Sequence, residues 1–97
     1  MGCVVIFEFR IKADRVNSMR EWLRDNLRDT RAFDGFQTLV ATTNQDAPHD
    51  VVVIEQWDTR QHYERYIAWR TERGDIDTVV SMIDGEPTIR FLDYLGV

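Results

Sequence analysis

The sequence has little cysteine, no long apolar run and no cluster of basic residues. Cys3 is the only cysteine, so no disulfide can form within the chain and no site with several cysteine ligands can bind a metal. A chain without disulfides fits a reducing compartment, which predicts a cytoplasmic protein. The apolar run at 3–7 is far too short to span a membrane, and no basic stretch precedes it as in a signal peptide. We therefore expect no membrane partner.

Positive charge is also scarce. The chain of 97 residues carries 17 Asp and Glu against 12 Lys and Arg, a formal net charge of −5. Proteins that bind nucleic acid through its phosphates need clustered positive charge, so we expect no nucleic-acid partner. Hydrophobic residues make up 43% and charged residues 30% of the chain, as in ordinary globular proteins. The length fits one domain over residues 1–97.

The motifs of common cofactors are missing. The sequence contains neither a glycine-rich phosphate loop nor a dinucleotide fingerprint. Its two histidines, His49 and His62, are not spaced like the pairs that bind zinc from one helix. The sequence therefore gives no reason to expect a metal or an organic cofactor.

Hydrophobic periodicity predicts four strands and two main helices. Strands are expected at 3–11, 36–43, 51–57 and 88–95. The first helix is expected to be capped by Asp14 and to end near Phe33, before Asp34 and Gly35. The second is expected at 60–73, capped by Asp58 or Thr59 and stopped by Gly74, with a short helical turn at 77–83. A polar loop at 44–50 joins the second and third strands as an antiparallel hairpin.

This order, β-α-β-β-α-β, predicts a ferredoxin-like α+β fold with a four-stranded antiparallel sheet. Two helices of this length cover only one face of such a sheet. Every predicted strand nevertheless carries apolar side chains on both faces. Because exposed apolar area of that extent usually marks an interface, we expect a homodimer in which the uncovered faces pack together.

Residues 51–66 resemble the antibiotic biosynthesis monooxygenase (ABM) family, because a hydrophobic strand ends in Trp57 and a helix with a polar cap follows. The segment 69–74, the last strand from Pro87 and the opening strand with its helix are also similar to that family. The resemblance covers essentially the whole chain and implies a dimeric α+β barrel. Its members include cofactor-free oxygenases of phenolic polyketides, quinol oxygenases, haem-degrading oxygenases and proteins without an assigned role.

The sequence departs from the haem-degrading branch of the family. That branch uses an Asn on the first strand, a Trp on the second helix and a His beyond it. The corresponding positions here are Phe9, Tyr66 and roughly Ile76, and none matches. Other members place a His nine residues after the strand-end Trp, a position that is again Tyr66. His62 lies one turn earlier, so alignment does not transfer that role to it.

The candidate site is the gap between the second helix and the sheet. His62, Tyr66, Trp69 and Arg73 lie on adjoining turns of one helix edge and suit an aromatic, acidic substrate. With the resemblance, this predicts a cofactor-independent monooxygenase acting on a small phenolic or quinol substrate. Histidine is the residue type that most often acts as a general base near neutral pH, so we predict catalytic roles for His62, Tyr66 and Arg73. The predicted substrate-binding residues are Phe9, Trp57, Trp69 and Arg70.

Structural roles for these residues stay open. Aromatic residues at helical spacing also pack cores, and a histidine in the first turn of a helix also lies on the surface. The strand residues Glu8, Arg10, Glu55 and Arg90 are expected to form ion pairs, with Glu55 beside Arg90 or Arg10. A ligand-binding or accessory dimer without turnover is the alternative function, because fold alone does not decide activity.

Overall fold

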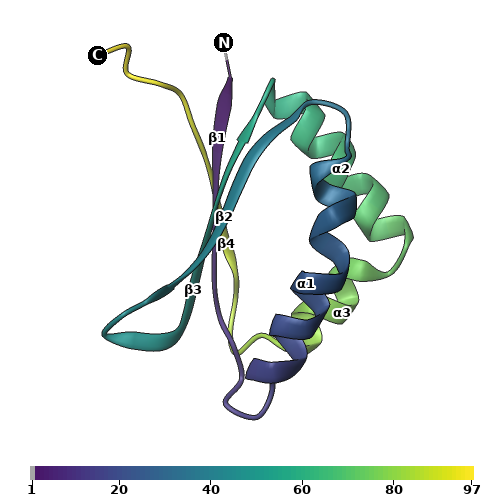
Figure 1. Cartoon of the computed structure of the whole chain (residues 1–97), viewed down its shortest axis with the longest axis vertical. Coiled ribbons are helices and arrows are strands. Elements are labelled where there is room, and N and C mark those ends of the chain that lie inside the picture. Colours follow the sequence, from purple (N-terminus) through teal and green to yellow (C-terminus); the bar gives the residue numbers. More distant parts are fainter. Residues whose placement is uncertain (1) are drawn as a thin grey trace.

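The computed structural model describes residues 2–97 and consists of two layers (Figure 1). A four-stranded antiparallel sheet forms one layer, and three helices cover one of its faces. The elements in chain order are β1 (Cys3–Arg10), α1 (Val16–Arg31), β2 (Phe36–Asn44), β3 (Ala47–Trp57), α2 (Arg60–Glu72), α3 (Asp75–Ser81) and β4 (Thr88–Leu92). The predicted ferredoxin-like order is confirmed, and α3 corresponds to the helical turn expected before the last strand.

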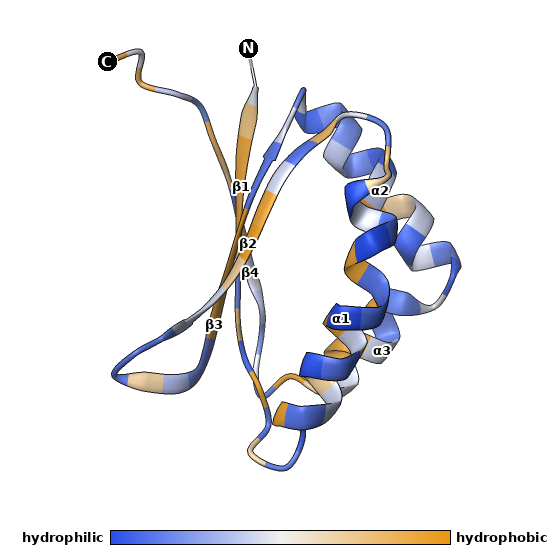
Figure 2. Ribbon diagram, in the orientation of Figure 1, coloured by the Kyte–Doolittle hydropathy of each residue, from blue (hydrophilic) through white to orange (hydrophobic). Residues whose placement is uncertain are grey.

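The strand order in the sheet is β2-β3-β1-β4, so β1 and β3 are central. Along β1, Cys3 pairs with Trp57 and Phe9 pairs with Val51. Successive residues of a strand point to opposite faces, so this register places the odd-numbered residues of β1 and β3 together. They form the inner face, which packs against the helices and holds most of the buried apolar residues. Figure 2 shows the hydrophobic strands beside helices whose outward sides are hydrophilic.

The hairpin between β2 and β3 is tighter than predicted. A polar loop was expected at 44–50, but β3 already begins at Ala47, which pairs with Asn44. The turn is held locally, because the Asn44 Oδ1 accepts a hydrogen bond from the Asp46 backbone N–H at 2.9 Å. Ladder hydrogen bonds join backbone groups, so polar side chains do not end a strand. The last strand is also shorter than predicted, since it was expected at 88–95 and ends at Leu92.

The helix ends agree with the predictions except at the start of α1. Arg15 occupies the N-cap position and makes no side-chain cap, so the expected cap by Asp14 is wrong. The helix begins only at Val16, which leaves Asp14 one residue too early to cap it. Thr59 does cap α2, and its Oγ1 accepts a hydrogen bond from the His62 backbone N–H at 3.2 Å. Gly74 follows α2 with a φ of 83°, as expected of a stop signal.

The other face of the sheet, called the outer face below, carries the strand ion pairs. Arg90 donates to Glu8 at 2.6 Å, and Arg10 lies 3.5 Å from Asp50. The expected pairing of Glu55 with Arg90 or Arg10 is wrong. Glu55 is odd-numbered on β3 and lies on the inner face, whereas both arginines are on the outer face.

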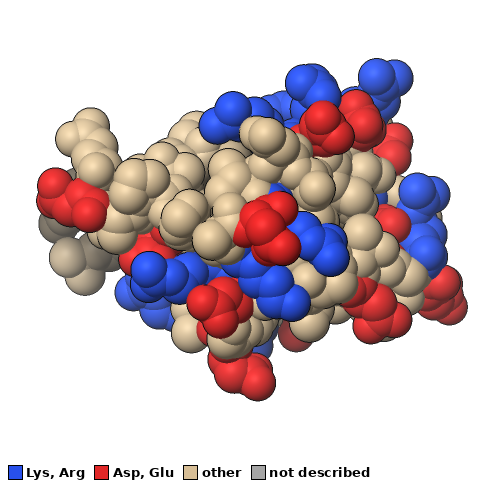
Figure 3. Space-filling model, turned by 90° about the horizontal axis from the view of Figure 1, so that it is seen from below, with Lys and Arg blue, Asp and Glu red and all other residues tan. Residues whose placement is uncertain are grey.

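No described helix covers the outer face (Figure 1), and several of its apolar side chains are exposed. Val40 is 55% exposed, Ile54 39% and Leu92 39%. None of the helices within residues 2–97 is long and apolar enough to cross a membrane. Figure 3 views the molecule from the end that is lowest in Figure 1 and shows acidic and basic side chains interspersed there.

Candidate functional site

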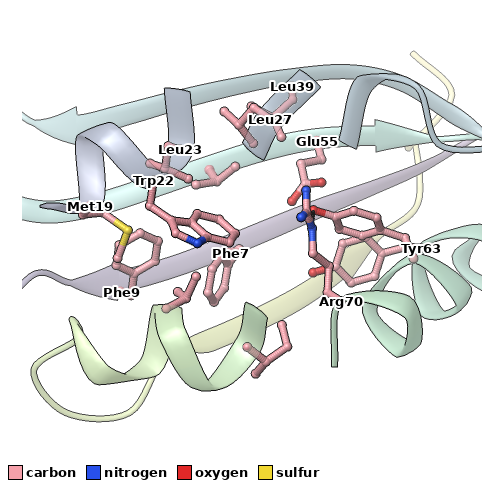
Figure 4. Close-up of a pocket in the computed structure, with 14 residues that line it drawn as sticks. Phe7, Phe9, Met19, Trp22, Leu23, Leu27, Leu39, Glu55, Tyr63 and Arg70 are labelled. Carbon is pink, nitrogen blue, oxygen red and sulfur yellow. Dashed lines mark hydrogen bonds between the residues drawn. The ribbon is translucent and has the colours of Figure 1, made fainter. Parts of the chain in front are cut away.

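A cavity of about 80 Å³ lies between the inner face of the sheet and the helices (Figure 4). It is called the inner cavity below. Its apolar walls include Phe7, Phe9, Met19, Trp22, Leu23 and Leu39. Its polar groups come from β3 and α2 and are Glu55, Tyr63, Tyr66 and Arg70. A few convergent polar groups in an apolar hollow are the usual composition of a small-molecule site.

Glu55 is a buried acid without a cationic partner among the residues that the structure describes. Only 4% of the residue is exposed, and its register places it between Val5 of β1 and Leu39 of β2. One carboxylate oxygen, Oε1, accepts a hydrogen bond from the Trp57 indole Nε1–H at 3.1 Å. None of the ion pairs among the described residues involves Glu55. In Figure 4 its carboxyl group points from the sheet toward the side chains of α2.

The environment of Glu55 changes its proton affinity. Burial raises the pKa of its carboxyl group from the usual 4.5 to about 7, while the hydrogen bond from Trp57 opposes part of that rise. A carboxylate that is half ionised near neutral pH can both take and give a proton under physiological conditions. Glu55 therefore has the properties of a general base aimed at an apolar cavity.

Arg70 is also buried, but its charge has several hydrogen-bond partners. Its Nε donates to the Tyr66 Oη at 2.9 Å, and its Nη1 donates to Asp75 at 2.8 Å. Its Nη2 donates to the Asn26 carbonyl oxygen at 2.8 Å and to the Thr30 Oγ1 at 2.9 Å. This one side chain of α2 therefore binds α1 and the start of α3, in the fork geometry that only arginine offers.

The same network orients the Tyr66 hydroxyl. Its Oη lies 2.7 Å from the Thr30 Oγ1 and accepts the bond from Arg70. Burial raises the pKa of Tyr66, and the bonds to Thr30 and Arg70 oppose the rise, so the phenol is protonated at neutral pH. Burial disfavours the Arg70 cation, but the bonds to Asp75 and Tyr66 hold its pKa above the ordinary value. Tyr66 is therefore a neutral phenol in the cavity wall, and the hydrogen bond from the charged Arg70 guanidinium holds it in place.

The structure places His62 away from the inner cavity. Its Nδ1 lies 2.7 Å from the Thr59 Oγ1, and its Nε2 is 3.7 Å from the Asp34 carboxylate. The ring packs against Gly35 so closely that a β-carbon there would have no room. His62 sits in the first turn of α2, where the chain enters from β3, and this turns the ring toward the β2 side. Its position does not fit the predicted base.

Arg73 and Trp69 also point away from the cavity. Arg73 is about half exposed, with its guanidinium 4.8 Å from the centre of the Trp69 ring and its Nε 3.1 Å from Asp75. Trp69 packs against Phe33 and lies under the Arg70 guanidinium. Both residues therefore support the Arg70 network from outside, and neither lines the cavity.

The remaining predicted residues divide between the cavity and its support. Tyr66, Arg70 and Phe9 line the cavity. Trp57 is completely buried among aromatic rings, 5.1 Å from the ring of Tyr66, and reaches the site through its bond to Glu55. The site extends beneath α1 and α3 as well as α2, wider than the predicted gap under the second helix.

Sequence reasoning missed Glu55 and Trp22 as cavity residues. One signal for Glu55 was present, because it shares the odd positions of its strand with Val51, Val53 and Trp57. Burying a carboxylate among apolar side chains is costly unless it is paired, so an acid at this position of the strand indicates a functional role. Trp22 of α1 forms another part of the cavity wall.

The described residues contain no group of three or more His, Cys, Asp or Glu side chains placed to hold a metal ion. The chemistry that the inner cavity offers from its own residues is proton transfer by Glu55 and hydrogen bonding by Tyr66. Apolar and aromatic walls would exclude water and stack on a planar ligand.

Comparisons with known proteins agree on fold and family. The family model described as "Antibiotic biosynthesis monooxygenase" matches residues 3–71. A conserved protein from Methanosarcina mazei Go1 superposes with a TM-score of 0.87 at 13% identity, covering 95% of this chain and 91% of that one. Rv0793 from Mycobacterium tuberculosis superposes with a TM-score of 0.86 at 18% identity, and the match covers 100% of this chain and 98% of that one. An antibiotic biosynthesis monooxygenase superposes with a TM-score of 0.86 at 18% identity, and the match covers 96% of this chain and 98% of that one. No curated protein matches by sequence.

The Arg70 network predicts that its geometry matters more than its charge. We expect Arg70→Lys to lower the free energy of unfolding by about 2 kcal/mol or more, because one ammonium group cannot reach all the partners of the guanidinium. Arg73→Lys is the matched control, since Arg73 binds the same Asp75 from a half-exposed position, and should cost less than about 1 kcal/mol. Urea denaturation measures both, and equal losses would contradict the network.

Glu55 predicts a pH dependence of stability. The folded protein holds the Glu55 proton up to about pH 7, whereas the unfolded chain releases it near 4.5. Stability therefore falls as the pH rises through this window, by up to about 3 kcal/mol. We expect Glu55→Gln to remove this loss, so that the variant gains on the wild type between pH 5 and 8. Exposed Glu72 provides the control variant, Glu72→Gln, which should follow the wild type in urea titrations at each pH.

Proposed function

The chain belongs to the antibiotic biosynthesis monooxygenase family, and on that basis we propose that it oxidises a small phenolic or quinol substrate in the inner cavity without a cofactor. The observation that carries the proposal is Glu55, a carboxyl group that is 4% exposed, has no ion-pair partner among residues 2–97 and lines an apolar cavity. Keeping such a group costs stability, and perturbed acids in cavities concentrate at functional sites.

The proposed reaction uses electrons from the substrate itself. Glu55 accepts a proton from a phenolic O–H or from a carbon activated by the ring, which leaves an electron-rich anion. The anion passes an electron to dioxygen, and recombination forms a carbon–peroxide bond. Where the oxygenated carbon still carries a hydrogen, the peroxide takes back the proton from Glu55, and loss of that hydrogen as a proton with cleavage of the O–O bond gives a carbonyl group and water. One oxygen atom enters the substrate and the other leaves as water, so no external reductant is required.

Tyr66 and Arg70 supply the complementary donor. If the Thr30 hydroxyl donates to the Tyr66 Oη, that oxygen accepts two hydrogen bonds, because Arg70 Nε already donates to it. The Tyr66 hydrogen is then free to point at an oxygen of the substrate. Two accepted bonds strengthen the phenol as a donor toward developing negative charge. In this role Tyr66 touches the substrate, whereas Arg70 positions Tyr66.

The size of the cavity favours a single ring. Its volume of about 80 Å³ is below the roughly 150 Å³ of an engineered cavity that binds benzene. One ring can enter if Met19 moves, since methionine is unbranched and adapts readily to new shapes. A fused polycycle would have to displace several walls at once. We therefore propose a monocyclic phenol or quinol as the substrate class.

We further propose that the protein is a homodimer joined through the outer face. The outer face exposes Val40, Ile54 and Leu92, although each lies on a strand and none is covered by a described helix. A two-fold arrangement would place the same residues of each copy against one another. Burying this surface removes contiguous apolar area from water, which is the main source of affinity in a stable dimer.

Oxygen uptake with a monocyclic quinol tests the catalytic proposal. We expect Glu55→Gln to lower kcat by about 100-fold or more, the usual contribution of a positioned base. The wild-type rate should rise as the pH increases through about 7, because the base must be ionised. Glu72→Gln serves as the matched control and should keep the wild-type rate. Ligand binding without any oxygen uptake by the wild type would instead support a binding or accessory protein.

Sedimentation of outer-face variants tests the dimer. We expect Ile54→Glu to shift the protein from dimer to monomer, because two carboxylates would be buried in one interface. Val80→Glu is the control, since Val80 is 48% exposed on α3, away from the outer face, and should leave the dimer intact. A wild-type protein that sediments as a monomer at micromolar concentration would exclude the proposed interface.

A further inference from the structure

A second hollow lies beside the inner cavity, between the N-terminal half of α1 and the hairpin of β2 and β3. Its volume is about 420 Å³, within the usual range of small-molecule pockets. It reaches the surface, because Arg20, Ala41 and Pro48 on its walls are exposed. Met19 and Leu23 line both hollows and separate them. We call this second hollow the α1 groove.

The walls of the α1 groove combine an apolar floor with one arginine and one histidine. Ile11, Val16 and Val51 belong to the floor, and Arg20 and His49 also line it. No Asp or Glu is among the lining residues, although acids outnumber bases in the chain. The first turn of α1, which contributes Val16 and Met19 to the lining, also carries no acidic residue. This distribution differs from the mixed charge of the chain as a whole.

Within the described residues, no acid neutralises the charge of Arg20. Neither Arg20 nor His49 takes part in any ion pair among residues 2–97. By contrast, two arginines next to lining residues in the sequence are paired. Arg10 precedes Ile11 and Arg24 follows Leu23, and each arginine lies within 4 Å of an aspartate. An unpaired arginine above an apolar floor can bind a carboxylate while the floor covers the rest of the ligand.

We propose that the α1 groove is a binding site for a small organic carboxylate with an apolar body, such as an aromatic acid. The carboxylate lies at the edge with Arg20 and His49, and the apolar body covers Val16, Ile11 and Val51. The site is distinct from the inner cavity, where the negative charge of Glu55 opposes a carboxylate. It therefore does not depend on the proposed oxidation, and the two can fail separately.

Binding of benzoate, followed by NMR titration of the backbone amides, tests the site, with benzyl alcohol as the uncharged ligand of similar shape. We expect Arg20→Gln to weaken benzoate about fivefold and to leave benzyl alcohol unchanged. A fivefold loss corresponds to about 1 kcal/mol, the upper end for an exposed ion pair. Arg24→Gln is the matched control on the next turn of α1, where the side chain is 68% exposed, and should change neither affinity.

Two further variants distinguish the α1 groove from the inner cavity. Ala41→Trp fills the groove from β2 and should abolish the binding of both ligands, with Thr43→Trp as the substitute if the first variant fails to fold. Glu55→Gln should leave benzoate affinity unchanged, whereas a ligand in the inner cavity would bind more tightly once the charge is removed. Tighter binding to Glu55→Gln, equal losses with Arg20→Gln and Arg24→Gln, or no benzoate binding at millimolar concentration would overturn the proposal.

Discussion

The buried guanidinium of Arg70 is the constraint on which the arrangement of the helices depends. A charge removed from water must be matched by partners, or the cost reaches several kcal/mol. Arg70 finds them in three helices, at Asn26 and Thr30 of α1, Tyr66 of α2 and Asp75 of α3. Each hydrogen bond fixes a distance between elements that are far apart in sequence. The network therefore fixes how α1, α2 and α3 lie over the sheet, and these helices form the wall of the inner cavity opposite the sheet.

Glu55 and Arg70 are both buried, yet the protein treats the two charges in opposite ways. Arg70 is surrounded by acceptors and stays ionised, whereas Glu55 has a single donor, the Trp57 indole, and its pKa rises to about 7. The compensated group contributes order and holds Tyr66 in place. The uncompensated group remains able to exchange a proton. A site for acid–base chemistry needs both kinds of group, because a reactive acid is useful only where its surroundings are rigid.

The two faces of the sheet follow from the register of β1 and β3. Odd residues face the helices and enclose the inner cavity, while even residues carry the ion pairs and the exposed apolar surface. This alternation was readable in the sequence, and it led correctly to the fold and to an outer face without a helix. The pairing of individual charges was not readable. Glu55 was expected to pair with Arg90 or Arg10, which lie on the outer face. It shares the odd positions of β3 with Val51, Val53 and Trp57, and those positions point to the inner face.

The sequence by itself determined the element order, the stop glycine Gly74, a cap for α2 at Asp58 or Thr59 and the ABM family, because these depend on periodicity and on short-range chemistry. It also pointed to Tyr66, Arg70 and Phe9, which do line the cavity. Only the tertiary structure decided that His62 and Arg73 point away from it and that Glu55 is its acid. The physical reason is that helical spacing gives the face on which a side chain lies but not what packs against that face. Thr30 and Tyr66 are 36 residues apart and meet only when α1 and α2 pack together. Contacts of that kind fix which groups are buried, and burial in turn fixes which of them can do chemistry.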